Sequence, residues 1–264
     1  MSENKINLAW LWPKYQGAVP FNANVIFRLH NRDFSIRCLY LEKCSEKPDY
    51  FLEKGIQTAY ITENRIRFFD PFYVMKLAKI LRKNNIHILH CHKHKAVVFG
   101  LLAAKIAKTP VVLAHVHGLN RTRTLVRRLF NSIVLRRVTK LIAISEAVKS
   151  DILASNPSIE ADKVITLVNS IEFPRYADVS ITSDQARQLL GVPVGAFIFG
   201  TVGRLAPTKG QHLLIEAFAK VKTRVPNAYL VLVGTGPLEN ALKNQTQKLG
   251  ISNSVTFAGF RDDI

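Results

Sequence analysis

The sequence predicts an α/β protein with two Rossmann-like domains in series, the second of them incomplete. Short apolar runs alternate with helical stretches along most of the 264 residues, an order that implies right-handed βαβ units on parallel sheets. That length is comfortable for two domains. The pattern is interrupted at 171–195 by a stretch containing Pro, Gly and Ser but no long apolar run. We therefore predict one domain at 1–172, a crossover at 173–195 and a partial domain at 196–264.

The first domain is predicted from apolar runs that are nearly continuous, as in strands buried on both faces of a parallel sheet. The predicted strands are 5–12, 34–41, 55–61, 86–92, 110–118, 140–145 and 163–170. The predicted helices are 21–32, 70–85, 95–108, 122–138 and 145–153. Asp70 and Ser145 are expected to cap two of these helices, and Pro71 suits a first helical turn.

The second domain is predicted from a shorter series of the same kind. Its strands are 196–205, 228–234 and 254–259, and its helices are 210–226 and 236–250. Doubly wound sheets usually have five or six strands, so about three strands make an incomplete sheet.

A candidate anion site follows the first strand of this second domain, in "GTVGRLAPTKGQHLLIEAF" at 200–218. Gly203 lets the backbone approach a ligand, Arg204 can contact two phosphate oxygens at once, and Lys209 supplies a point charge. Gly210 precedes a helix whose N-terminus adds free N–H groups. Ligands of open α/β sheets bind beyond the carboxyl ends of strands, which is where this stretch lies.

A second turn with two glycines follows the next strand. In "VGTGPLENAL", Gly234 and Gly236 stand between a strand and a helix, where a nucleotide base or ribose has room to lie. Neither turn is a Walker A loop or a full G-x-G-x-x-G, so a nicotinamide-dependent enzyme has little support. Each glycine alone also fits a tight turn, and each cation alone fits a solvated surface.

The joint pattern resembles a known family. The segments "VGRL", "KG", "LIEAF", "LVLVGTGP" and "VTFAGF" are similar to the nucleotide-binding half of retaining GT-B glycosyltransferases of the family 4 (group 1) type. In the first half, "ILHCH", "PVVLAHVHG", "LIAISEAVKSDI" and "VITLVNSIE" follow in that family's order and spacing. The resemblance covers nearly the whole chain.

The resemblance implies a nucleotide-sugar donor, such as UDP-glucose, held between the two domains. Arg204 and Lys209 match residues that hold the diphosphate and take up charge on the leaving group, and His117 matches a histidine near the transferred sugar. Gly17 matches a glycine-bearing loop over the phosphates, where the family usually has two adjacent glycines. The expected acceptor is a cell-surface polysaccharide or lipopolysaccharide, and no metal or other cofactor is expected.

One family feature has no match in this sequence. The family carries a Glu-x7-Glu segment that contacts the sugar and ribose, and no two glutamates here are eight positions apart. We therefore expect a C-terminally truncated chain: a shortened reading frame, a fragment or one product of a split gene. Such a chain is expected to be inactive by itself, and a non-catalytic remnant or half-enzyme is the first alternative.

The formal net charge of +18 is concentrated in the first half of the chain. Residues 1–170 carry 27 Lys and Arg against 12 Asp and Glu, whereas the remaining residues carry 10 against 7. The stretch 121–140 is basic and amphipathic, which suits either an ordinary packed helix or an anionic membrane surface. The acceptor or membrane side is expected at Arg121, Arg123, Arg127 and Arg128.

Other function classes are less well supported. A basic nucleic-acid-binding protein would explain the charge, but no recognition helix, zinc finger or RNP-like strand is visible, so no nucleic-acid partner is expected. The alternating His90, His92 and His94 invite a metal site, but a strand end with loop histidines is favoured. The three cysteines show no paired framework, and no apolar run is long enough to span a membrane. A cytoplasmic protein, peripheral on the inner face of the membrane, is the resulting expectation.

Overall fold

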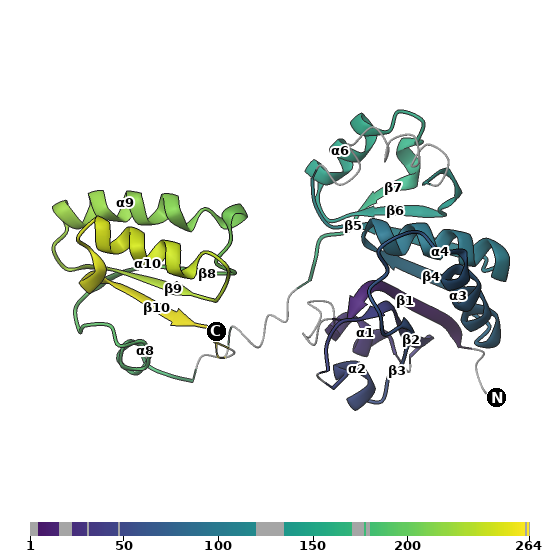
Figure 1. Cartoon of the computed structure of the whole chain (residues 1–264), viewed down its shortest axis with the longest axis horizontal. Helices are drawn as coiled ribbons and strands as arrows, with labels where there is room; N and C mark the ends of the chain where they lie inside the picture. The colour runs from purple at the N-terminus through teal and green to yellow at the C-terminus, as the bar shows by residue number, and fades with distance from the viewer. Residues whose placement is uncertain are drawn as a thin grey trace. The chain divides into compact units, whose positions relative to one another are not determined.

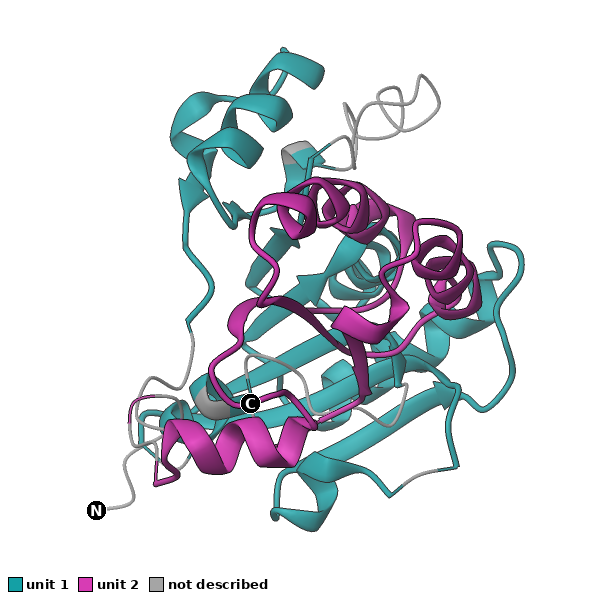
Figure 2. Ribbon diagram, turned by 90° about the vertical axis from the view of Figure 1, so that its left-hand side faces the viewer, with its two compact units in different colours: residues 1–172 teal, residues 173–264 magenta. Residues whose placement is uncertain are grey.

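The computed structural model divides the chain into two compact units, which Figure 2 shows in teal and magenta. Unit 1 comprises Met1–Glu172 and unit 2 comprises Phe173–Ile264. The residues that the structure describes are 5–15, 23–30, 32–46, 48–119, 135–170, 177, 180–261 and 263.

Unit 1 is built on a seven-stranded sheet with the strand order β3-β2-β1-β4-β5-β6-β7, in which every neighbouring pair is parallel (Figure 1). Its strands are β1 (Ile6–Tyr15), β2 (Phe34–Lys43), β3 (Gln57–Thr62), β4 (Ile88–His92), β5 (Val111–Val116), β6 (Lys140–Ala143) and β7 (Val164–Thr166). Each strand overlaps a predicted one, because a strand buried on both faces has the nearly continuous apolar sequence that identified it.

Within the described residues, three helices of unit 1 begin at polar side-chain caps, namely Asp49, Asp70 and Ser145. Its helices are α1 (Ala23–Leu29), α2 (Tyr50–Glu53), α3 (Pro71–Lys83), α4 (Lys93–Ala107) and α6 (Glu146–Ser155), with 3₁₀ turns η1 (Leu135–Arg137) and η2 (Ala161–Lys163). The predicted caps are confirmed, because Asp70 accepts a hydrogen bond from the Phe72 N–H and Ser145 accepts one from the Val148 N–H. Each bond satisfies one of the free N–H groups of a helix start.

The sheet of unit 1 carries a different core on each face. On one face, α3 and α4 pack against side chains such as Leu11 and Leu89 in an aliphatic core. On the other face, Trp10, Trp12 and Tyr40 form an aromatic core with α1 and α2. Successive residues of a strand point to opposite faces, so β1 supplies both cores.

A buried carboxylate joins three segments of unit 1. Glu42, near the end of β2, is fully buried and accepts a hydrogen bond of 3.0 Å from the Ile66 N–H. It also forms ion pairs with Lys14, at 3.3 Å, and with Lys95 on α4. Burial opposes ionisation of Glu42, but the hydrogen bonds from Lys95 and Ile66 prevail, and the pKa of the carboxyl is lowered.

Unit 2 is built on a three-stranded parallel sheet with the order β10-β9-β8. Its strands are β8 (Phe197–Val202), β9 (Ala228–Val233) and β10 (Val255–Gly259), and its helices are α8 (Ser183–Leu190), α9 (Gln211–Arg224) and α10 (Glu239–Lys248), with 3₁₀ turns η3 (Pro207–Lys209) and η4 (Ser252–Ser254). Helices α9 and α10 cover one face of the sheet, and α8 lies on the other side (Figure 1). The predicted fold class, α/β with an incomplete second sheet, is confirmed.

Two helices are additions to the predicted elements, and one predicted helix falls mostly outside the described residues. The short α2 was not predicted. Helix α8 lies inside the stretch predicted as a crossover, where Thr182 and Gln185 form a reciprocal capping box and Gly191 ends the helix at φ 63°. Of the predicted helix 122–138, only residues from 135 onward are described, and they form η1 and the turn after it.

We expect Gly100→Ala to destabilise unit 1, because α4 contacts the sheet at this glycine. A Cβ atom there would lie 2.4 Å from Sγ of Cys91 and 3.1 Å from Cδ2 of Leu11, both fully buried. Overpacking outweighs the helix propensity that Ala adds, so the net loss is about 1–2 kcal/mol in the free energy of unfolding. Urea denaturation measures it. The control is Gly200→Ala, whose Cβ would meet its nearest atom at 3.9 Å, and an equal loss in both variants would contradict the packing argument.

Candidate functional site

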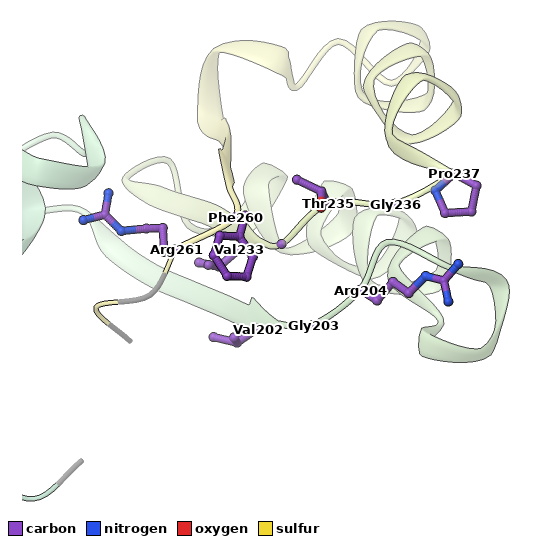
Figure 3. A pocket seen from close by; sticks show the side chains of 10 residues that line it. Val202, Gly203, Arg204, Val233, Thr235, Gly236, Pro237, Phe260 and Arg261 are labelled. Atoms are coloured by element: carbon purple, nitrogen blue, oxygen red, sulfur yellow. The ribbon is translucent and has the colours of Figure 1, made fainter. Parts of the chain in front are cut away.

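A pocket opens at the carboxyl ends of the three strands of unit 2. Its volume is about 440 Å³, enough for part of a nucleotide-sized ligand. Figure 3 shows Arg204 and Arg261 on opposite flanks of this pocket, with Phe260 between them. The lining residues come from the loops that follow β8, β9 and β10: Val202, Gly203, Arg204, Val233, Gly234, Thr235, Gly236, Pro237, Phe260 and Arg261.

Backbone hydrogen bonds hold the three loops of the pocket together. The Gly203 N–H donates to the Val233 carbonyl at 2.9 Å, and the Leu205 N–H donates to the Thr235 carbonyl at 3.0 Å. The Gly234 N–H in turn donates to the Gly259 carbonyl at 2.7 Å. The rim of the pocket is therefore formed by backbone segments of neighbouring loops that cross one another in direct contact.

Two glycines of the pocket are required by this close crossing. A Cβ at Gly234, where φ is 129°, would lie 2.1 Å from the Gly203 carbonyl oxygen. A Cβ at Gly236 would lie 2.3 Å from the Leu205 carbonyl oxygen. Real Cβ atoms do not approach backbone oxygens this closely, so both turns depend on the absence of a side chain.

Arg204 and Lys209 lie in the loop between β8 and α9, and both side chains are exposed. The buried Gln211 donates a hydrogen bond of 3.0 Å from Nε2 to the Arg204 carbonyl, which fixes the backbone at that arginine. Lys209 ends η3 and stands two residues before the start of α9, but it is not among the residues that line the pocket. Gly210 is the N-cap of α9 and offers no side-chain cap. The N–H groups at that helix start favour an anion.

The structure brings four of the predicted donor-site residues together, namely Gly203, Arg204, Gly234 and Gly236. Sequence reasoning missed Phe260 and Arg261, although both directly follow a predicted strand, and that position was a usable signal. Arg261 forms an ion pair with Asp263. Five further candidates lie outside the described residues: Gly17, Arg121, Arg123, Arg127 and Arg128.

His117 belongs to unit 1 and directly follows β5. Its Nε2 lies 2.9 Å from Nδ1 of His92, and its ring stacks on that of His115 with centroids 4.3 Å apart. Burial, together with the nearby charge of Lys93, lowers the pKa of His117 to about 4. The imidazole is therefore neutral at pH 7 and offers one donor and one acceptor nitrogen.

Two parallel-sheet units in one chain, with a pocket at the strand ends of the second, define the two-Rossmann-domain class of α/β proteins. Residues 15–172 match the family model Glycosyltransferase Family 4, and residues 182–264 match the model Glycosyl transferases group 1. The chain belongs to glycosyltransferase family 4. This assignment confirms the resemblance stated above.

Curated relatives match along different shares of their length. The Escherichia coli UDP-Gal:alpha-D-GlcNAc-diphosphoundecaprenol alpha-1,3-galactosyltransferase is 26% identical over 275 residues, covering 100% of this chain and 70% of that protein. The Staphylococcus aureus capsular polysaccharide biosynthesis glycosyltransferase CapM is 30% identical over 186 residues, covering 66% of this chain and 48% of that protein. The chain thus spans 70% of the first relative and about half of the second.

Solved structures share the fold. Anabaena Alr3699/HepE, solved in complex with UDP, superposes with a TM-score of 0.77 at 22% identity, covering 98% of this chain and 70% of that chain. A glycosyltransferase from Rickettsia africae superposes with a TM-score of 0.78 at 20% identity, covering 99% of this chain and 70% of that chain.

We expect Gly236→Ala to disturb the pocket as well as the stability of unit 2. The new methyl group would meet the Leu205 carbonyl oxygen at 2.3 Å, so one of the two loops must shift, and the free energy of unfolding falls by about 1–3 kcal/mol. Faster amide exchange at Leu205 and Leu238, whose N–H groups bond across these loops, measures the shift. Gly203→Ala is the control, because its Cβ would have no neighbour within 4 Å. Unchanged exchange in Gly236→Ala would contradict the crossing argument.

Proposed function

We propose that this chain carries the donor pocket of a retaining glycosyltransferase, which moves a sugar from a nucleotide-sugar donor to a cell-surface polysaccharide or lipopolysaccharide acceptor. The observation that carries the donor half of this proposal is the pocket at the ends of β8, β9 and β10, with its glycine backbone and Arg204 at its edge. A glycine-lined rim admits a diphosphate to the main chain, and an arginine contacts phosphate oxygens in pairs.

The names of relatives support the choice of substrates. The Escherichia coli relative is named for a UDP-galactose donor and a lipid-diphosphate acceptor, and CapM is named for capsular polysaccharide biosynthesis. Two proteins of the same fold are named for lipopolysaccharide synthesis, the outer core galactosyltransferase WaaB and the glycosyltransferase WaaG. For this chain, these names favour a uridine diphosphate sugar as the donor and a glycan of the cell envelope as the acceptor.

The proposed transfer breaks the bond between the anomeric carbon of the donor sugar and the β-phosphate oxygen. A bond from that carbon to an acceptor hydroxyl oxygen forms, the hydroxyl proton passes to an oxygen of the departing diphosphate, and the nucleoside diphosphate leaves with the electron pair of the broken bond. Arg204 and Lys209 would stabilise the charge that develops on the leaving phosphate, which is the largest single contribution in many enzymes. In this proposal Gly17 and His117 keep the roles that the family resemblance implies for them, at the donor phosphates and the transferred sugar.

The donor site predicts a loss of nucleotide affinity on removal of either cation. Arg204→Ala should weaken UDP binding by about 10–100-fold, because a charge-assisted phosphate contact is worth about 1.5–3 kcal/mol. Lys209→Ala should have a smaller effect, since Lys209 is exposed beside the pocket and does not line it. Titration calorimetry with UDP measures both variants.

Lys220→Ala is the matched control, because Lys220 is exposed at the far end of α9 from the pocket loops. If UDP binds Arg204→Ala as tightly as it binds Lys220→Ala, the donor site has been assigned to the wrong loop.

An exposed apolar patch supports a membrane surface as the place of work. Phe68, Phe69, Phe72 and Met75, at the start of α3, are 85%, 56%, 65% and 55% exposed. Within the residues that the structure describes, no helix is both long and apolar enough to cross a membrane. We propose that these side chains enter the interfacial region of an anionic membrane from the cytoplasmic side, so that unit 1 meets a lipid-linked acceptor there. Exposed aromatic rings beside cations are typical of such interfacial contact.

The cations of this surface are Arg65, Arg67, Lys76 and Lys79, all exposed around the same patch. They complement the negative charge of anionic lipid, where each basic residue contributes about 1 kcal/mol. The stretch 121–140, from which the sequence suggested membrane contact, lies largely outside the described residues.

We expect the protein to sediment with vesicles that contain anionic lipid, and to bind them less as salt rises. Replacing Arg65 and Arg67 by Gln should lower vesicle affinity about 10–30-fold at low salt. Replacing Phe68 and Phe72 by Ser should lower it at every salt concentration, because that contribution is apolar. Leu189→Ser, on an exposed leucine of unit 2, is the control. Equal binding to neutral vesicles, or no effect of either double variant, would contradict this surface.

A further inference from the structure

Three histidines gather on one face of the sheet of unit 1. His90 and His92 stand two residues apart on β4, and His115 on β5 is the register partner of His92. Side chains two residues apart on a strand point to the same face, and register partners stand side by side. The three imidazoles therefore come from two adjacent strands, near the carboxyl edge of the sheet.

The cluster is buried, and its nitrogen atoms are not satisfied. His90, His92 and His115 are 6%, 0% and 6% exposed. Nε2 of each of the three, and Nδ1 of His115, have no hydrogen-bond partner among the residues that the structure describes. A buried polar atom without a partner costs about 1–3 kcal/mol, so such atoms gathered in one place call for an occupant, which could bind one nitrogen of each histidine.

The protonation state of the cluster suits a cation. Burial, together with the neighbouring histidines, lowers the pKa of His90 and of His115 to about 3 and that of His92 well below its ordinary value. All three are neutral at pH 7, and the neutral imidazole is the form that ligates metals.

The spacing of the nitrogens is close to that of a coordination shell. One nitrogen from each of the three histidines lies within 4.8 Å of the others. Tetrahedral zinc, with Zn–N bonds of about 2.0–2.1 Å, requires nitrogens about 3.4 Å apart. Rotation of the imidazoles about their Cβ–Cγ bonds moves the ring nitrogens while the strands stay in place.

A second contact orients one of the three ligands. Nδ1 of His92 lies 2.9 Å from Nε2 of His117. When Nδ1 of His92 carries the proton and donates it to His117, Nε2 of His92 keeps its lone pair for a cation. Metal-ligating histidines almost always have their other ring nitrogen bonded in this way.

Aromatic rings surround the cluster on the side of β1. Trp12 stacks on His92 with centroids 4.1 Å apart, and Trp10 lies 4.7 Å from His90. Ring stacking is the alternative explanation of the cluster, and the rings of His90 and His115 do stack, with centroids 5.3 Å apart. Stacking uses the ring faces, however, and gives no hydrogen-bond partner to the four in-plane nitrogens that lack one.

We propose that His90, His92 and His115 form a binding site for one divalent transition-metal ion, of which Zn²⁺ fits best. Three histidine nitrogens with a fourth position left open are an established donor set for zinc, and imidazole also suits Cu²⁺ and Ni²⁺. From the sequence, the alternating His90, His92 and His94 were the histidines that suggested a metal site, and no metal was expected. The third ligand of the proposed site is His115, on the neighbouring strand, whereas His94 lies in α4.

The test is metal binding to the full, untagged chain after chelator treatment. Zn²⁺ titrated by calorimetry should bind at one ion per chain, and Co²⁺ should give the visible absorption bands of tetrahedral nitrogen coordination. His90→Gln and His115→Gln should each weaken Zn²⁺ binding by about 100-fold or more, since loss of even a supporting contact costs about 10–100-fold. His212→Gln, an exposed histidine on α9 in unit 2, should leave binding unchanged.

The Co²⁺ spectrum of the unaltered chain keeps the test valid where a variant fails to fold, and circular dichroism shows which variants fold. Binding of Zn²⁺ that is equally tight in folded His115→Gln and in His212→Gln would overturn the proposal. So would a Co²⁺ spectrum that is unchanged from the aqueous ion. Neither result would bear on the donor pocket, because that site shares no residue with the cluster.

Discussion

The parallel direction of every strand pair determines where chemistry can occur in this protein. In a parallel sheet the chain must return across a face before the next strand begins, so all carboxyl ends meet at one edge. Both units place residues of their candidate sites there. In unit 2 that edge holds Gly203, Arg204 and the glycine turn after β9, and in unit 1 it holds His92 and His117. The parallel topology alone therefore brings residues that are distant in sequence to the same edge of the sheet.

The two faces of the large sheet of unit 1 differ in the kinds of side chain that they bury. The face under α3 and α4 is mainly aliphatic, whereas the face of Trp10 and Trp12 contains the histidine cluster. Aromatic rings offer stacking partners to imidazoles, which offsets part of the cost of burying them. This difference allows one strand, β4, to present Leu89 and Cys91 to a dry core and His90 and His92 to a polar one.

The features that could be predicted from the sequence are those that depend on a local pattern of residues. Strands appeared as apolar runs, and Asp70 and Ser145 marked helix starts, because caps act on N–H groups two or three residues away. Helix α8 was not predicted, since it is short and mostly polar, and its apolar residues Ala186, Leu189 and Leu190 span a single helical turn. The pairing of His92 with His115 was also beyond reach, because register between strands is set by the whole sheet. The roles assigned to Gly17 and His117 remain proposals for the same reason, as they depend on how distant segments meet.

The buried carboxylate of Glu42 has a consequence for cooperativity. Its hydrogen bonds reach Ile66 and Lys95, which stand 24 and 53 residues further along the chain. A compact state in which either segment is out of place leaves a charge inside the protein without its full set of partners, at a cost of several kcal/mol. The penalty falls on partly assembled forms and is absent from the complete fold. One glutamate therefore widens the energy gap between the native sheet and its near misses, and makes the assembly of β1, β2 and α4 closer to all-or-none.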